Sequence, residues 1–133
     1  MRIFVYEHLC ATAATGTVAD SLAVEGWAML AALLVDFGRL PGVVIDTMLG
    51  RGGAPPAGLT LSAGVVYDFL MVDGSEEMPF RRLAGVADWT LVVAPEFDDI
   101  LANRLRWVEE AGGRSLNDLS VASQKRVRTS RTS

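Results

Sequence analysis

Short apolar runs alternate along this chain with longer stretches of helical spacing. The apolar runs fall at residues 2–6, 43–49, 65–72 and 88–94, and a further short strand is expected at 114–116. Runs that are apolar at nearly every position are typical of strands buried on both faces of a parallel sheet. Asp68 interrupts the third run, so we expect that strand to lie nearer an edge of the sheet.

Three helices are expected between these strands. They span residues 20–37, 75–87 and 95–111, and the segments 11–19 and 50–58 are expected to be loops because of their small, glycine and proline residues. Asp20 or Ser21 can cap the first helix, and Ser75 can cap the second. The third opens at Pro95, behind which Glu96, Asp98 and Asp99 would lie in a first turn where the helix dipole favours acids.

The first helix is apolar nearly all round. Leu30, Leu34 and Phe37 have the spacing of a core-facing stripe, but Trp27 and Met29 make other faces apolar as well. Such a helix needs cover on two sides. It lies either deep in the domain or against a partner, so we expect self-association or a second polypeptide.

The order of these elements predicts the fold class. Strands that alternate with helices indicate an α/β, Rossmann-like, doubly wound and mainly parallel sheet of about four to five strands, with helices on both faces. We expect one such domain over residues 1–116. Residues 117–133 form a basic, Ser/Thr/Arg-rich tail with too few apolar groups to order itself, so we expect the tail to be disordered.

Net charge and cysteine content limit the kinds of partner and the cell compartment that we expect for this chain. The chain has 133 residues and a net charge of −4, and its pI is near 4.9, which argues against nucleic acid as a partner. The end of the chain from Arg114 carries +4, so the remainder carries −8. Cys10 is the single cysteine, which excludes an internal disulfide and favours a cytoplasmic protein. No signal peptide is expected, because Glu7 and His8 interrupt the first apolar run. No membrane span is expected either, because the longest apolar segment, 22–40, is short and contains three charged residues.

Polar residues follow two of the predicted strands. Glu7 and His8 come after the first strand, and Pro95 and Glu96 come after the strand at 88–94. In a doubly wound sheet both sets would face the crevice at the carboxyl ends of the strands, where ligands bind. Carboxylates there suit the ammonium group of a small ligand. The alternative is structural, because acids behind a proline also fit a helix start and a lone histidine is often only a hydrogen-bonded residue.

Other chemistries have less support. His8 and Cys10 could form a thiol dyad, but Cys10 lies among apolar residues and no third group orients the pair. One histidine and one cysteine leave only carboxylates as further metal ligands, and no phosphate-binding loop occurs. Lys125 is the only lysine and lies in the tail, so the chain has few cations to bind ATP.

Five segments of the chain resemble the amino-terminal, pre-ATP-grasp domain of ATP-grasp carboxylate–amine ligases, over residues 1–116. They are Ile3-Phe-Val-Tyr-Glu-His-Leu, Ser21-Leu with Glu25-Gly-Trp-Ala-Met-Leu, Asp36-Phe through Leu40-Pro-Gly-Val, Ala87-Asp-Trp-Thr-Leu-Val-Val-Ala-Pro-Glu-Phe-Asp, and Trp107-Val-Glu-Glu-Ala-Gly-Gly. Within the family the chain is most similar to the tyramine–glutamate ligase branch. Where the family has a Gly-Pro-Ser-like turn and an Asp-Lys pair, this chain has Leu116-Asn-Asp-Leu-Ser and Gln124-Lys125.

The resemblance implies a function. In the family this domain shapes the substrate site, and two further lobes bind ATP and Mg²⁺ and form an acyl phosphate that an amine attacks. By resemblance, Glu7, His8, Pro95 and Glu96 line the substrate side, while Ser21 and Glu25 fix the helix over it. We therefore expect an isolated or truncated substrate-side domain that binds a small amino acid or amine, has no cofactor of its own, and is not catalytic alone. The alternatives are a flavodoxin-like binding or interaction module and, third, a thiol hydrolase.

Overall fold

A computed structural model describes residues 1–12, 20–50, 66–72 and 75–117 of the chain. Its strands are β1 (Arg2–Glu7), β2 (Val44–Gly50), β3 (Val66–Val72) and β4 (Trp89–Val93), and its helices are α1 (His8–Ala11), α2 (Asp20–Phe37), α3 (Glu77–Val86) and α4 (Ile100–Glu110), with a 3-10 turn η1 (Phe97–Asp99) before α4. The expected caps at Asp20 and Ser21, the expected loop beyond Gly50 and the basic tail beyond Asn117 lie outside the described residues or side chains.

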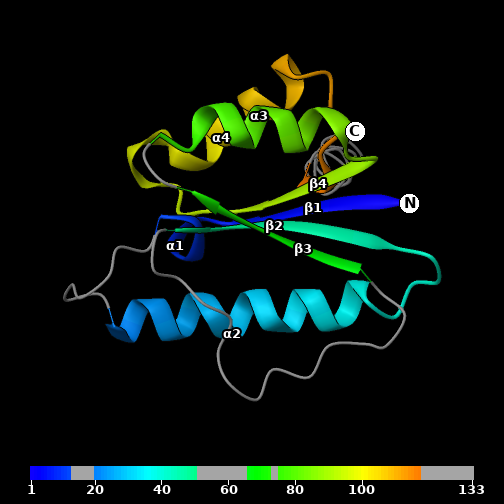
Figure 1. The fold of residues 1–133 in the computed structure, drawn as a ribbon. Coiled ribbons are helices and arrows are strands. Elements are labelled where there is room, and N and C mark those ends of the chain that lie inside the picture. Colours follow the sequence, from blue (N-terminus) through cyan, green and yellow to red (C-terminus); the bar gives the residue numbers. More distant parts are fainter. Residues whose placement is uncertain (13–19, 51–65, 73–74, 118–133) are drawn as a thin grey trace, which may run out of the picture.

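The strands form one parallel sheet in the order β3-β2-β1-β4 (Figure 1). This confirms the α/β, Rossmann-like class, with four strands. The order is that of the first four strands of the Rossmann fold, whereas a flavodoxin-like sheet places its third strand beside the first. The flavodoxin-like topology of our alternative interpretation is therefore not the one observed.

Helices cover both faces of the sheet (Figure 1). The connection from β1 to β2 contains α2, and the connection from β3 to β4 contains α3 and runs back in the opposite direction. Because such crossovers are right-handed, reversing the direction moves the helix to the other face. The direction changes between β1 and β4, so the carboxyl ends of these two neighbouring strands are the topological switch point where ligands bind in open α/β sheets.

Alternate residues of β1 enter two separate cores. Phe4 and Tyr6 pack with Phe80 and Val108 on the α3/α4 side. Residues on the opposite side of the strand pack against α2, where Leu30 and Leu34 are fully buried and Phe37 is partly buried. The core spacing predicted for this helix is therefore confirmed. Met29 of α2 is half exposed, so part of the apolar surface of the helix is open to solvent.

Local features of the helices differ from the expectations, and the N-cap of α3 is Glu76 and not Ser75. α1 occupies the first residue of the segment that was expected to be a loop and begins three residues earlier, at His8. The third helix does not open at Pro95, because Asp98 and Asp99 both have φ of 56° and α4 begins only at Ile100. Aspartate tolerates this left-handed conformation better than most residues, so the acids precede the helix and are not in its first turn.

The chain beyond α4 covers the outer edge of β4. The backbone of Thr90 bonds to Arg114, and an isolated bridge joins Thr90 to Ser115. Asn117 then bonds through its side chain to both backbone groups of Val92, at 2.9 and 3.0 Å. The strand expected at 114–116 is thus a single bridge extended by one amide side chain. None of the helices in the described residues is long and apolar enough to cross a membrane.

Candidate functional site

Four polar side chains meet at the carboxyl end of β1, on the α3/α4 side of the sheet. We call Tyr6, His8, Glu76 and Arg104 the polar cluster. Tyr6 belongs to β1, His8 opens α1, Glu76 occupies the N-cap position of α3, and Arg104 lies in the middle of α4. The cluster therefore joins three parts of the chain that are far apart in the sequence, namely the β1–α1 junction, the start of α3 and the middle of α4, beside the switch point between β1 and β4.

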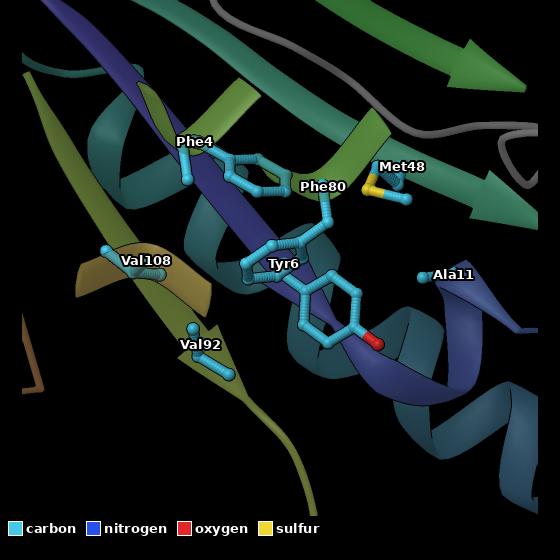
Figure 2. Close-up of a cluster of buried hydrophobic side chains, with 8 residues drawn as sticks. Phe4, Tyr6, Ala11, Met48, Phe80, Val92 and Val108 are labelled. Carbon is cyan, nitrogen blue, oxygen red and sulfur yellow. The ribbon is translucent and has the colours of Figure 1, made fainter. Parts of the chain in front are cut away.

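Tyr6 links the hydrophobic core to the polar cluster. Its ring packs edge-on against Phe80 at 5.0 Å and against Phe4 at 6.3 Å between centroids. Figure 2 shows the ring within this core and the hydroxyl oxygen directed away from Phe4. An aromatic ring that packs in a core while its hydroxyl finds polar partners is the usual arrangement of a buried tyrosine.

The Tyr6 hydroxyl lies within hydrogen-bond distance of all three other members of the polar cluster. It is 3.0 and 3.1 Å from the two carboxylate oxygens of Glu76, 3.1 Å from Nε of Arg104 and 2.9 Å from Nδ1 of His8. Arg104 also forms a salt bridge with Glu76, and the side chain of each is only 12% exposed. The charges are thus paired and bonded, as buried ionic groups must be to persist.

The guanidinium of Arg104 is held from a second side. Its central carbon lies 4.1 Å from the ring centroid of Trp107, one turn further along α4. Arginine stacks well on indole, and this contact restricts the orientation of the guanidinium. Arg104 is therefore fixed by an aromatic ring, a carboxylate and a phenol.

Burial shifts the pKa values of two members of the polar cluster, Tyr6 and His8. Desolvation, reinforced by the Glu76 carboxylate, raises the pKa of Tyr6 well above its ordinary value of 10.0, so Tyr6 keeps its proton. Burial lowers the pKa of His8 below its ordinary value of 6.5; Glu76 and Glu7 oppose this effect and Arg104 adds to it. His8 is therefore a neutral imidazole at pH 7.

The four residues predicted to line the substrate site lie at this edge of the sheet, in different surroundings. Glu7 is buried, and its two oxygens accept hydrogen bonds from the backbone amides of Leu9 and Cys10, at 3.1 and 2.7 Å. It therefore caps α1, on the side of the sheet that α2 covers. His8 is half-buried, and its Nδ1 bonds to the Tyr6 hydroxyl within the polar cluster.

Pro95 and Glu96 follow the strand beside β1. Glu7 is the register partner of Val93, so these residues come directly after the neighbouring strand end. Pro95 is half-buried and its carbonyl accepts a bond from Leu101, whereas Glu96 is exposed. The expected pairing of Glu7 with Glu96 around one ammonium group stays a prediction, and Glu7 would have to share its oxygens with the α1 amides.

Tyr6, Glu76 and Arg104 are not among the site residues that the sequence predicts. Tyr6 belongs to the apolar run at 2–6, and Glu76 follows the expected cap Ser75. Arg104 offered a usable signal, because it lies beside Leu101, Leu105 and Val108 on the stripe of α4 that packs inward. An arginine in an apolar stripe needs a buried partner, and that requirement points to a distant carboxylate.

The polar cluster places the imidazole of His8 near a paired carboxylate and guanidinium. It lies beside the switch point of a Rossmann-like sheet, which is where ligands bind in open α/β sheets. Within the described residues, no group of three or more His, Cys, Asp or Glu side chains could hold a metal ion.

Comparison with known families gives a match over part of the chain. Residues 67–122 match the family of the pre ATP-grasp 3 domain. The matched stretch runs from β3 through α4 and contains Glu76, Pro95, Glu96 and Arg104. No curated protein and no solved structure matches the chain significantly. The match supports the resemblance to the pre-ATP-grasp domains of ATP-grasp ligases.

Proposed function

We propose that this chain is a substrate-side, pre-ATP-grasp domain of an ATP-dependent carboxylate–amine ligase, of the tyramine–glutamate ligase branch. It binds a small amino acid or amine at the carboxyl ends of β1 and β4 and does not turn it over alone. The observation that carries the proposal is the family match over residues 67–122. In such ligases other lobes bind ATP and Mg²⁺, and these lobes or a second copy of the chain would be its partner.

The charges near the polar cluster support an amine as the ligand. Glu96 is exposed at the end of β4, and His8 is a neutral imidazole at the end of β1. A carboxylate and an imidazole lone pair both accept hydrogen bonds from an ammonium group. Pro95, directly before Glu96, adds a rigid, half-buried apolar residue at the end of β4.

The start of α1 argues against a nucleotide. In dinucleotide-binding folds the pyrophosphate sits on the backbone amides that open the helix after the first strand. Here the Glu7 carboxylate bonds to the amides of Leu9 and Cys10, so the anion at this position is supplied by the chain itself. A phosphate would have to displace Glu7, which supports an amine site over the nucleotide-binding module that was our alternative.

A ligand panel tests the proposal. Thermal shift and calorimetry would compare tyramine, glutamate and other amino acids with ATP, NAD and FMN. We expect amines or amino acids to bind and Glu96→Gln to weaken that binding about tenfold or more, because a charge-assisted bond is lost. Glu109→Gln, on the exposed end of α4, is the matched control and should bind as the wild type does. Binding of nucleotides alone would favour the interaction module, and unchanged affinity of the Glu96 variant would remove that residue from the site.

A further inference from the structure

The hydrogen bonds of the Tyr6 hydroxyl determine which nitrogen of His8 carries the proton. A phenol has one proton to donate and two lone pairs that accept. Its three neighbours are Glu76, Arg104 and His8, at the distances given above. Each neighbour must therefore be matched either to the proton or to a lone pair.

Two of the three assignments follow directly from chemistry. The Nε–H group of Arg104 can only donate, so it occupies one lone pair of the Tyr6 oxygen. Glu76 is salt-bridged to Arg104 and, as a carboxylate, can only accept, so it receives the Tyr6 proton. One lone pair of the phenol remains for His8.

Nδ1 of His8 must then be the donor in its 2.9 Å bond to Tyr6. The reverse assignment would give the Tyr6 proton to His8 and leave two bare oxygens, of Tyr6 and Glu76, facing each other at 3.0 Å. That contact is repulsive, whereas the first assignment satisfies every group. In the neutral ring, a proton on Nδ1 leaves the lone pair on Nε2.

We propose that Nε2 of His8 is the hydrogen-bond acceptor that binds the ammonium group of the ligand, with its tautomer set by Tyr6, Glu76 and Arg104. This deepens the proposed function and rests on it, because it names the ligand group that the site receives. In the described part of the chain, Nε2 has no hydrogen-bond partner. Tyr6, Glu76 and Arg104 act as positioning residues, since they contact the ring of His8 or each other and not the ligand.

The tautomer of His8 makes the site prefer an amine to a carboxylate. An Nε2 lone pair accepts from N–H donors and offers nothing to a carboxylate. Glu76 and Glu7 favour the charged imidazole, while burial and Arg104 favour the neutral one, and the net effect lowers the pKa of His8. We expect amine binding to weaken as acid protonates His8, because Nε2 then becomes a donor.

His8 is the only histidine, so one nuclear magnetic resonance spectrum tests the tautomer without assignment. A long-range ¹H–¹⁵N spectrum of histidine-labelled protein at pH 8 should show a protonated Nδ1 and an unprotonated Nε2. Tyr6→Phe should release the ring into the tautomer mixture of a solvated imidazole, whereas Tyr67→Phe, at the other tyrosine, should leave it unchanged. A ring protonated on Nε2 in the wild type overturns the inference.

The ligand half is tested in the same sample with n-butylammonium and its matched anion, butyrate. We expect the Nε2 resonance to shift with butylammonium and not with butyrate, and the shift to be lost in Tyr6→Phe. If the calorimetric panel shows that amines bind but Nε2 does not respond, the inference fails and the proposed function stands. If no amine binds in the panel, the proposed function itself fails, whatever the tautomer of His8.

Discussion

Glu7 and Gly26 meet where the end of β1 passes under α2. A β-carbon on residue 26 would lie 2.7 Å from Oε2 of Glu7 and 3.0 Å from the β-carbon of Leu9. Real β-carbons do not approach other atoms this closely, so the missing side chain allows the helix to pack against the turn that begins α1. The carboxylate that caps α1 also fills the space beside Gly26. A larger residue at position 26 would therefore displace this carboxylate or the helix.

Gly26→Ala should therefore destabilise the fold. In an unobstructed helix this change stabilises by up to about 1 kcal/mol, but here the added methyl group forces Glu7 or the helix to move, and we expect a net loss of about 1–3 kcal/mol. Urea denaturation measures the difference. In a Glu7→Ala background the same change should cost less, because its nearest neighbour is gone. A more stable Gly26→Ala protein would contradict the close packing.

Arg104→Met should cost more than a typical surface change. It leaves the carboxylate of Glu76 buried without its cation, and breaking a buried pair in this way costs about 3–5 kcal/mol. Arg106→Met is the matched control on the same helix, since its pair with Glu110 is exposed and should contribute about 1 kcal/mol or less. Adding Glu76→Gln to Arg104→Met should restore part of the loss. If the two arginine variants are equally stable, the polar cluster is not an organised ionic site.

His8 makes the stability of the protein depend on pH in a defined direction. Its pKa in the folded state is lowered by burial, with Arg104 adding to the effect. The unfolded chain therefore binds a proton first as the pH falls below 6.5, the ordinary value. The stability associated with the neutral ring is complete above that pH and is lost as the pH falls through the folded pKa.

The His8→Gln variant isolates this dependence. Its free energy of unfolding should change less than that of the wild type between pH 7 and the acid side of 6.5, because glutamine does not titrate. Denaturation curves at several pH values give the comparison. A steeper fall in the variant would mean that the folded pKa of His8 is raised and that the sign of our assignment is wrong.

Cys10 should behave as a structural thiol. Its side chain is 2% exposed, and burial, together with the nearby Glu7, raises its pKa well above the ordinary value of 9.0. A disulfide reagent at neutral pH should react at least about a hundredfold more slowly with the native protein than with the protein in urea, since reaction requires local opening. Rapid stoichiometric labelling of the native protein would instead support the thiol hydrolase that the sequence leaves open.

Local patterns were sufficient to predict most elements of the fold. The continuous apolar runs at β1 and β4 identify strands. Both faces of a parallel sheet are covered, so apolar residues occur at successive positions and do not alternate with polar ones. The two helix predictions that were wrong also depended on local features of the chain. α1 spans only four residues and depends on the Glu7 carboxylate that caps it, and the acids after Pro95 match a helix start that the backbone of Asp98 and Asp99 does not form.

The candidate site was only partly predictable, for a different reason. His8 could be found because polar residues at a strand end are visible in the sequence. Glu76 and Arg104, which bond to Tyr6, are about 70 and 100 residues away from it, and only the sheet order and the crossover of α3 bring them together. The sequence offers one further signal for these partners: Arg104 is a charged residue within the apolar stripe of α4 that packs inward.

A map of amide chemical shifts would locate the ligand on the domain. Uniformly ¹⁵N-labelled protein would be titrated with the amine or amino acid that binds best in the panel. We predict that the largest shifts fall at His8, Glu76, Glu96 and Arg104, around the carboxyl ends of β1 and β4. If these amides do not shift and the changes fall instead on the exposed face of α2, around Met29, the ligand site is not at the carboxyl ends of β1 and β4.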